Sequence, residues 1–104
     1  MTAPERLRVV VAGPEGPGDP RAVAVARALR DAGAEVVLTG VATSAGRLAA
    51  TVVQEDADAV VVADPPPGLP GALAAAGADD VAVVVLGDGG TPPGDVVAEL
   101  LRDR

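Results

Sequence analysis

The sequence predicts a small α/β protein in which one parallel sheet is covered by helices on both faces. The chain has 104 residues, close to the commonest size of one domain, and we expect a single domain over residues 1–104. Short, nearly continuous Val-rich runs suit strands buried on both faces of a parallel sheet. Each run is followed by a stretch of helical periodicity, and a β-α-β-α-β-α-β-α order implies right-handed crossovers.

The expected strands share a run of three or more apolar residues closed by Gly or Asp. They are Leu7–Gly13 (LRVVVAG), Ala34–Gly40 (AEVVLTG), Asp58–Asp64 (DAVVVAD) and Asp80–Gly87 (DVAVVVLG). Gly- and Pro-rich loops follow the first, third and fourth of these strands. Because open α/β sheets bind ligands outside the carboxyl ends of their strands, a site is expected at these loops.

The expected helices lie between the strands and after the last one. They are Asp19–Gly33, Thr43–Ala57, Gly68–Asp80 and Gly94–Arg104. In the first, Asp19 is a candidate N-cap, Pro20 takes the first helical position and Gly33 marks the end. Thr43 or Ser44 is the candidate N-cap of the second helix, and a cap is the preferred interpretation of Ser44.

Composition excludes several classes of function. The net charge of −7 and the pI near 4.3 argue against nucleic acid and anionic membranes as partners. The chain has no His, Cys or Lys and no aromatic residue, so it lacks an imidazole base, a thiolate, the usual zinc ligands and a stacking platform. No apolar run approaches the roughly 20 residues that span a bilayer. We therefore expect a soluble, cytoplasmic protein.

Two known ligand-binding patterns fit the loops poorly. The glycines of GPEGPG (Gly13–Gly18) do not match the dinucleotide-binding fingerprint G-x-G-x-x-G. Asp64 stands where a phospho-receiver domain has its acceptor, but the acid pair for Mg²⁺ and the Lys are missing. Asp56, Asp58, Asp79 and Asp80 are interpreted as solubilising acids of turns. No nucleophile and base can be paired at a recognisable spacing, so the protein is not expected to be an enzyme on its own.

Most of the chain resembles the cobalamin-binding domain of the methylmalonyl-CoA mutase family. The resemblance is carried by RLRVVVAG, by RAVAVARALRDAGAEVVLTG and by QEDADAVVVA. It continues in AAAGADDVAVVVLG and in GGTPPGD (Gly89–Asp95). It implies a flavodoxin-like or Rossmann-like three-layer domain with a parallel sheet of four, at most five, strands that lacks the last strand of the family. If the protein is part of an enzyme, it implies a subunit of a mutase-like isomerase.

The functional motifs of that family are degenerate here. In the family a loop His ligates cobalt and an Asp orients it; here the loop reads Gly16-Pro17-Gly18-Asp19, so the His position is empty. The Ser-x-Leu after the third strand is replaced by Asp64-Pro65-Pro66-Pro67. The resemblance leaves Gly16, Gly18, Asp19, Gly89 and Gly90 as vestigial cofactor-binding positions.

Two functions remain open from the sequence. The first is a non-catalytic module that acts by protein–protein association, as an accessory or partner subunit of a mutase or another acyl-CoA-related enzyme. A mean hydropathy of +0.37 and a sheet edge left open by a missing strand favour a protein partner or a homodimer. The alternative is a protein that binds a corrinoid or another small molecule. No metal and no cofactor are expected, and cobalamin only if it binds without an axial protein ligand.

Overall fold

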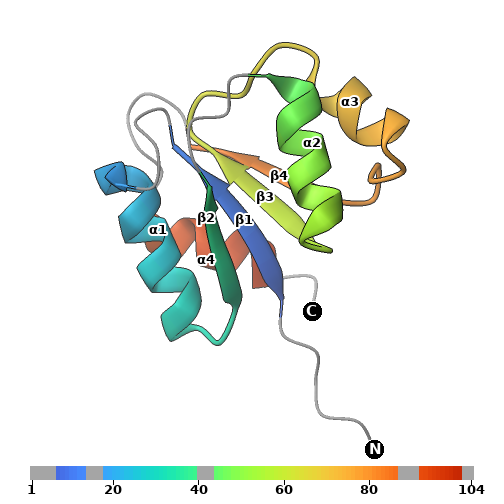
Figure 1. The fold of residues 1–104 in the computed structure, drawn as a ribbon. Coiled ribbons are helices and arrows are strands. Elements are labelled where there is room, and N and C mark those ends of the chain that lie inside the picture. Colours follow the sequence, from blue (N-terminus) through green and yellow to red (C-terminus); the bar gives the residue numbers. More distant parts are fainter. Residues whose placement is uncertain (1–6, 14–17, 40–43, 87–91, 102–104) are drawn as a thin grey trace, which may run out of the picture.

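A computed structural model describes residues 7–13, 18–39, 44–86 and 92–101 of the chain. Strands and helices alternate throughout, as predicted (Figure 1). The strands are β1 (Arg8–Ala12), β2 (Glu35–Thr39), β3 (Ala59–Val62) and β4 (Ala82–Val85), and the helices are α1 (Pro20–Asp31), α2 (Ala45–Gln54), α3 (Leu69–Ala75) and α4 (Pro93–Leu101). Within these ranges no helix is long and apolar enough to cross a bilayer.

The strands form one parallel sheet in the order β2-β1-β3-β4. Val10 of β1 lies between Val37 of β2 and Val60 of β3, and Val60 in turn faces Val83 of β4. The chain order reverses at β1, which is the arrangement of doubly wound α/β domains. The predicted α/β class with a four-stranded parallel sheet, of the flavodoxin-like or Rossmann-like three-layer kind, is confirmed.

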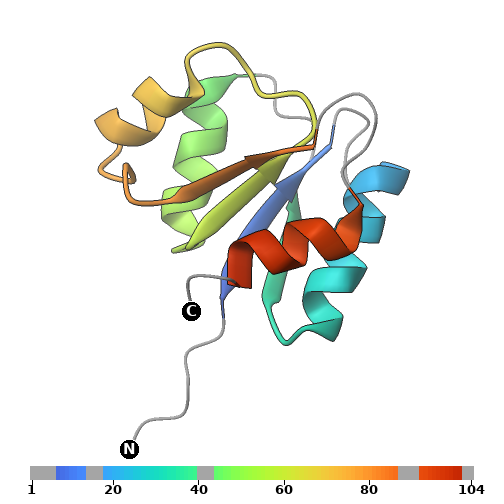
Figure 2. The ribbon, with the colours of Figure 1, turned by 180° about the vertical axis from the view of Figure 1, so that it is seen from behind.

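The helices divide into two layers. Figures 1 and 2 show α1 and α4 on one side of the sheet and α2 and α3 on the other. Because side chains alternate along a strand, Val9 and Val11 of β1 pack toward α1 and α4, whereas Val10 and Ala12 pack toward α2 and α3. The central strands β1 and β3 are therefore buried on both faces, as the Val-rich runs predict.

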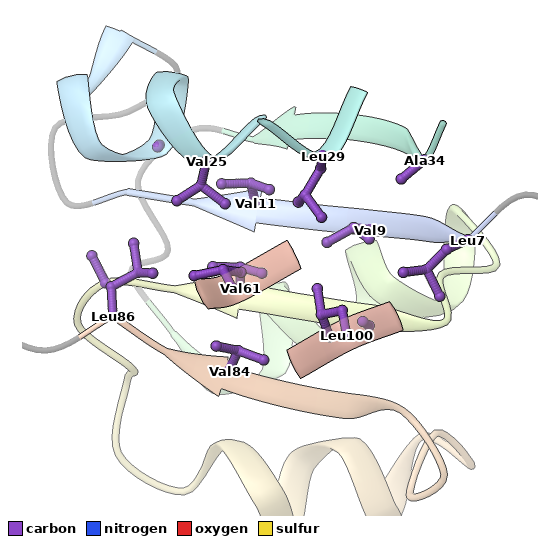
Figure 3. Close-up of a cluster of buried hydrophobic side chains, with 14 residues drawn as sticks. Leu7, Val9, Val11, Val25, Leu29, Ala34, Val61, Val84, Leu86 and Leu100 are labelled. Carbon is purple, nitrogen blue, oxygen red and sulfur yellow. The ribbon is translucent and has the colours of Figure 1, made fainter. Parts of the chain in front are cut away.

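The larger cluster lies under α1 and α4. Figure 3 shows Val11 and Val61 of the sheet facing Val25 and Leu29 of α1, with Leu100 of α4 beside them. Fully burying a Val or Leu side chain contributes about 1.5–3 kcal/mol. These clusters are the main source of stability in a chain that has no disulfide.

The helix boundaries follow the predicted signals. Asp19 caps α1 and Pro20 opens it, and Gly33, at φ +96°, follows its end. The hydroxyl of Ser44 accepts a hydrogen bond from the backbone N–H of Arg47 at 3.1 Å, which confirms its role as the cap of α2. Glycine suits Gly33 because positive φ is costly for residues that carry a Cβ.

The face of the sheet on which α4 packs shows whether α4 could connect β4 to a further strand beside it. The crossovers from β2 to β3 and from β3 to β4 run in the same direction across the sheet, and α2 and α3 both lie on one face. A further right-handed crossover to a strand beyond β4 would place its helix on that same face. Because α4 packs beside α1 on the opposite face, α4 is not such a crossover helix, and β4 is an edge strand of the described sheet.

Candidate functional site

The loop after β1 places one predicted site residue, Asp19, inside the protein. Its side chain is 1 % exposed, and its Oδ1 accepts hydrogen bonds from the backbone N–H groups of Arg21 (2.9 Å) and Ala22 (3.4 Å). The guanidinium Nε of Arg21 lies 3.7 Å from the same oxygen. Asp19 thus stabilises the N-terminus of α1 by capping and by its charge.

Gly13 makes room for that carboxylate. A Cβ at Gly13 would lie 2.7 Å from the Cβ and 2.9 Å from the Cγ of Asp19, and 3.1 Å from the Cβ of Ala22. These separations are too short for any larger residue unless the backbone moves. The glycine after β1 is therefore required by packing against the start of α1.

Of the other predicted site residues, one is described by the structure and three are not. Gly18 is exposed and precedes the cap of α1, with open space where a side chain would stand. Gly16, Gly89 and Gly90 lie outside the described residues. Vestigial cofactor binding by these glycines and Asp19 stays a prediction.

A small apolar cavity lies at the carboxyl edge of the sheet, on the α1 and α4 side. It has a volume of about 300 Å³, and its lining comes from the first turns of α1, the end of β4 and the segment entering α4: Pro20, Arg21, Ala24, Val25, Leu86, Pro92 and Pro93. Among the described residues of this lining, Arg21 is the one that carries a charge. The volume is at the lower end of the range for small-molecule sites.

The described residues offer no axial ligand for the cobalt of a corrinoid. In the family that the sequence resembles a loop imidazole ligates cobalt, and this chain contains no His. The carboxylate of Asp19 is turned into the cap of α1, so it does not present an oxygen ligand at the surface. Among the described residues, neither Val62 nor Ala63 at the end of β3 belongs to the lining of the cavity.

A larger and acidic cavity lies at the opposite, amino edge of the sheet. Its volume is about 480 Å³. It is lined by the ends of α2 and α3 and by the turns into β3 and β4: Val52, Val53, Asp56, Ala57, Asp58, Ala76, Gly77, Ala78, Asp80 and Val81. The sequence predicts only that these acids lie in solvated turns. The structure shows in addition that the two turns line one cavity. Among the described residues no group of His, Cys, Asp or Glu could hold a metal ion.

Arg8 ties the other elements together at this edge. Its guanidinium donates to Oε2 of Glu35 at 2.7 Å through Nη2 and to the backbone oxygen of Glu55 at 2.9 Å through Nη1. Its backbone N–H donates to Oδ2 of Asp58 at 2.9 Å. The hydrogen bond with Glu35, together with the charge of that carboxylate, raises the pKa of Arg8. The guanidinium of Arg8 thus links β2 to the end of α2, next to Asp56 of the acidic cavity.

The edge strand β4 differs from its prediction. The run AVVV predicts burial on both faces, but only Val84 is buried, at 6 %, whereas Val83 is 38 % and Val85 is 48 % exposed. The physical reason is its place in the sheet: α4 covers the face of Val84, and α2 and α3 leave much of the other face of β4 uncovered. The second edge strand, β2, is only half-buried along its length, for the same reason of edge position.

On the side away from β3, the backbone of β4 pairs with no other strand among the described residues. The N–H of Ala82 donates to the oxygen of Asp58, and the N–H of Leu86 donates to that of Val62. In a parallel ladder alternate residues bond to the same neighbour, so Val83 and Val85 direct their N–H and C=O groups to the open side. Exposed apolar side chains and free strand edges are both features that proteins normally cover.

Of the predicted site residues the structure describes Gly18 and Asp19, which are adjacent at the start of α1. It also identifies β4 as an exposed edge strand and shows an acidic cavity that the sequence did not single out. No protein-family model matches this chain, and no curated protein matches it.

Proposed function

We propose that this protein is a non-catalytic module that acts by protein–protein association and that it binds its partner through β4. The observation that carries the proposal is the combination on one strand of exposed apolar side chains, Val83 and Val85, with backbone groups that face no described strand. An added strand or a covering element would satisfy both at once.

The apolar area exposed on β4 is too small to hold a stable complex by itself. Covering the exposed parts of two Val side chains contributes on the order of 1–2 kcal/mol at the usual area coefficient. A stable complex needs roughly 800 Å² from each partner. The partner must therefore extend beyond β4, onto the neighbouring surface of α3 and the turns at the ends of the strand.

The side-chain chemistry supports a binding module over an enzyme. The whole sequence lacks His, Cys and Lys. The hydroxyl of its one serine, Ser44, caps α2 by accepting a hydrogen bond from the backbone N–H of Arg47. The described part of the protein pairs no nucleophile with a base. The resemblance to cobalamin-binding domains adds a finer proposal: the partner is a mutase or another acyl-CoA-related enzyme, of which this chain is an accessory subunit.

Capture followed by reconstitution tests association through β4. The tagged protein, the double variant Val83→Gln/Val85→Gln and the control Val23→Gln are used to capture proteins from the native cells. Val23 is a matched control because it is exposed to the same 38 % but lies on α1. Each captured protein is then purified, and its Kd for all three forms is measured by calorimetry.

The expected result is a partner whose affinity falls about tenfold or more with the double variant, since two buried contacts are lost and polar amides are placed in the interface. The control should bind within twofold of the unmodified protein. A captured protein that binds all three forms equally would contradict the proposal.

A second candidate function rests on the carboxyl-edge cavity. Its apolar lining with Arg21 at the rim suits a small ligand that has an apolar body and one anionic group. Titration with hydroxocobalamin and with adenosylcobalamin, followed by absorbance and calorimetry, tests its corrinoid version. The association proposal expects no binding at high micromolar concentrations. Tight binding that Arg21→Ala weakens would favour the second candidate.

A further inference from the structure

We propose that the partner presents an extended segment with apolar side chains at alternate positions and Lys or Arg at its flanks, and that this segment pairs with β4 as an added strand. This inference rests on the proposed association through β4 and specifies the chemistry of the partner. It is carried by the charge around β4 and by the geometry of the strand.

The second half of the chain is strongly acidic. Between Arg47 and Arg102 the sequence has no positively charged residue. Exposed acids lie at both ends of the β3 and β4 region: Asp79 and Asp80 lie in the turn before β4, and Asp64 follows β3. A surface with one sign of charge attracts a segment of the opposite sign and repels its like.

A second copy of this chain is the poorer occupant for the same reason. Pairing two β4 strands would bring one acidic half against another, and like charges across a strand pair are destabilising. The arginines of α1, Arg27 and Arg30, are exposed, but α1 packs on the opposite face of the sheet from α2 and α3. They are not available to a β4–β4 contact.

An extended segment fits β4 better than a helix does. A helix laid on the uncovered face would cover Val83 and Val85 but would leave their outward N–H and C=O groups unpaired. A strand pairs with those groups and places every second side chain on the same face as the two valines. Val83 and Val85 are two residues apart, so apolar side chains with a period of two match them.

The acidic cavity gives one flank of the segment a place to bind. The cavity is lined by Asp80 and Val81, the two residues that lead into β4. Asp56 and Asp58 lie in the same lining, and the volume of about 480 Å³ accommodates an Arg or Lys side chain. A basic residue beyond the amino end of β4 would therefore meet carboxylates while the centre of the segment meets valines.

Selection from a random peptide library tests this chemistry directly. Twelve-residue peptides are selected on the full chain, with counter-selection on Val83→Gln/Val85→Gln, which changes no charge. The expected winners carry alternating β-branched or other apolar residues with Lys or Arg at the flanks. N-methylation of alternate backbone amides in a winning peptide should abolish its binding, because it blocks strand pairing.

Charge variants then measure the acidic contribution. Asp79→Asn/Asp80→Asn is expected to weaken the selected peptide about threefold or more, as exposed ion pairs of this kind allow. Asp31→Asn/Glu99→Gln is the matched control: it removes the same charge from exposed positions on α1 and α4 and should leave affinity within twofold. Affinity should also fall as NaCl is raised from about 50 to about 500 mM.

The outcomes separate this inference from the proposal beneath it. Winning peptides that depend on Val83 and Val85 but are acidic or uncharged would overturn the inference and leave association through β4 standing. Peptides that bind the unmodified protein and the Val83→Gln/Val85→Gln variant equally, or no peptides at all, would overturn both. Basic winners that N-methylation does not weaken would also overturn strand pairing.

Discussion

The absence of a side chain at Gly13 leaves the space that the side chain of Asp19 occupies. We predict that Gly13→Ala destabilises the protein by about 1–3 kcal/mol, the usual cost of overpacking, because the new Cβ would meet the side chain of Asp19. Gly46→Ala is the control: Gly46 lies in α2 with open space around it, so the change should stabilise by up to about 1 kcal/mol. Urea unfolding measures both. Equal effects would contradict this packing argument.

The cap of α1 gives a second prediction. Asp19→Ala should cost about 1–2 kcal/mol, because the N–H groups of Arg21 and Ala22 lose their acceptor. Asp19→Ser should cost less, since a hydroxyl also caps helices. Urea unfolding of both variants tests this prediction. If Asp19→Ala left stability unchanged, the carboxylate would need another role.

Arg8 gives a prediction about pH. A raised pKa means that the stabilisation from Arg8 is complete below the pKa of the unfolded chain and is lost only as the pH rises through the folded value, far above neutrality. Arg8→Gln should therefore lower the midpoint of thermal unfolding, and to the same extent at about pH 6 and about pH 9. A loss confined to one of these pH values would contradict the assignment.

Single residues were predicted well where the signal is local. Asp19, Pro20, Gly33 and Ser44 each lie at the helix boundary that their chemistry predicts. The burial of Asp19 beneath Gly13 was not predictable, because it depends on how β1 and α1 pack. The acidic cavity was missed because its residues come from two turns that are distant in the sequence.

At the scale of elements, β4 makes the sharpest prediction. Val84→Gln should destabilise the protein strongly, by about 3 kcal/mol or more, since it places an amide in the core below α4. Val83→Gln/Val85→Gln should change stability by no more than about 1 kcal/mol, because both positions are exposed. Thermal and urea unfolding of the two variants distinguish the faces of the strand. Similar losses would mean that both faces are buried.

The same strand shows the limit of periodicity. The runs in β1, β3 and β4 are almost identical, and all predict burial on both faces. Only β1 and β3 are buried on both faces, because sheet order makes them central. Neither that order nor the packing of α4 beside α1 is encoded in the local pattern, so the strand sequence alone could not identify the exposed edge.

At the scale of the whole molecule, the net charge of −7 should oppose folding through self-repulsion. We predict that the midpoint of thermal unfolding rises with NaCl between about 10 and about 500 mM. Asp79→Asn/Asp80→Asn should raise it at low salt and reduce its salt dependence, since the two charges are adjacent and exposed. A midpoint that falls with salt would mean that favourable ion pairs, such as that of Arg8 with Glu35, outweigh the repulsion.

The class and layering of the whole molecule were predictable from alternation and right-handed crossovers. An open sheet edge was also expected, but the exposure of Val83 and Val85 on β4 was not, because it depends on what the helices leave uncovered.

Residue-resolved hydrogen exchange of β4, alone and with the captured partner, tests the central claim most directly. In the free protein the amides of Val83 and Val85 should exchange much faster than that of Val84, whose N–H faces β3. With the partner bound, Val83 and Val85 should become protected. Protection of all three amides in the free protein, or no change on binding, would contradict the account.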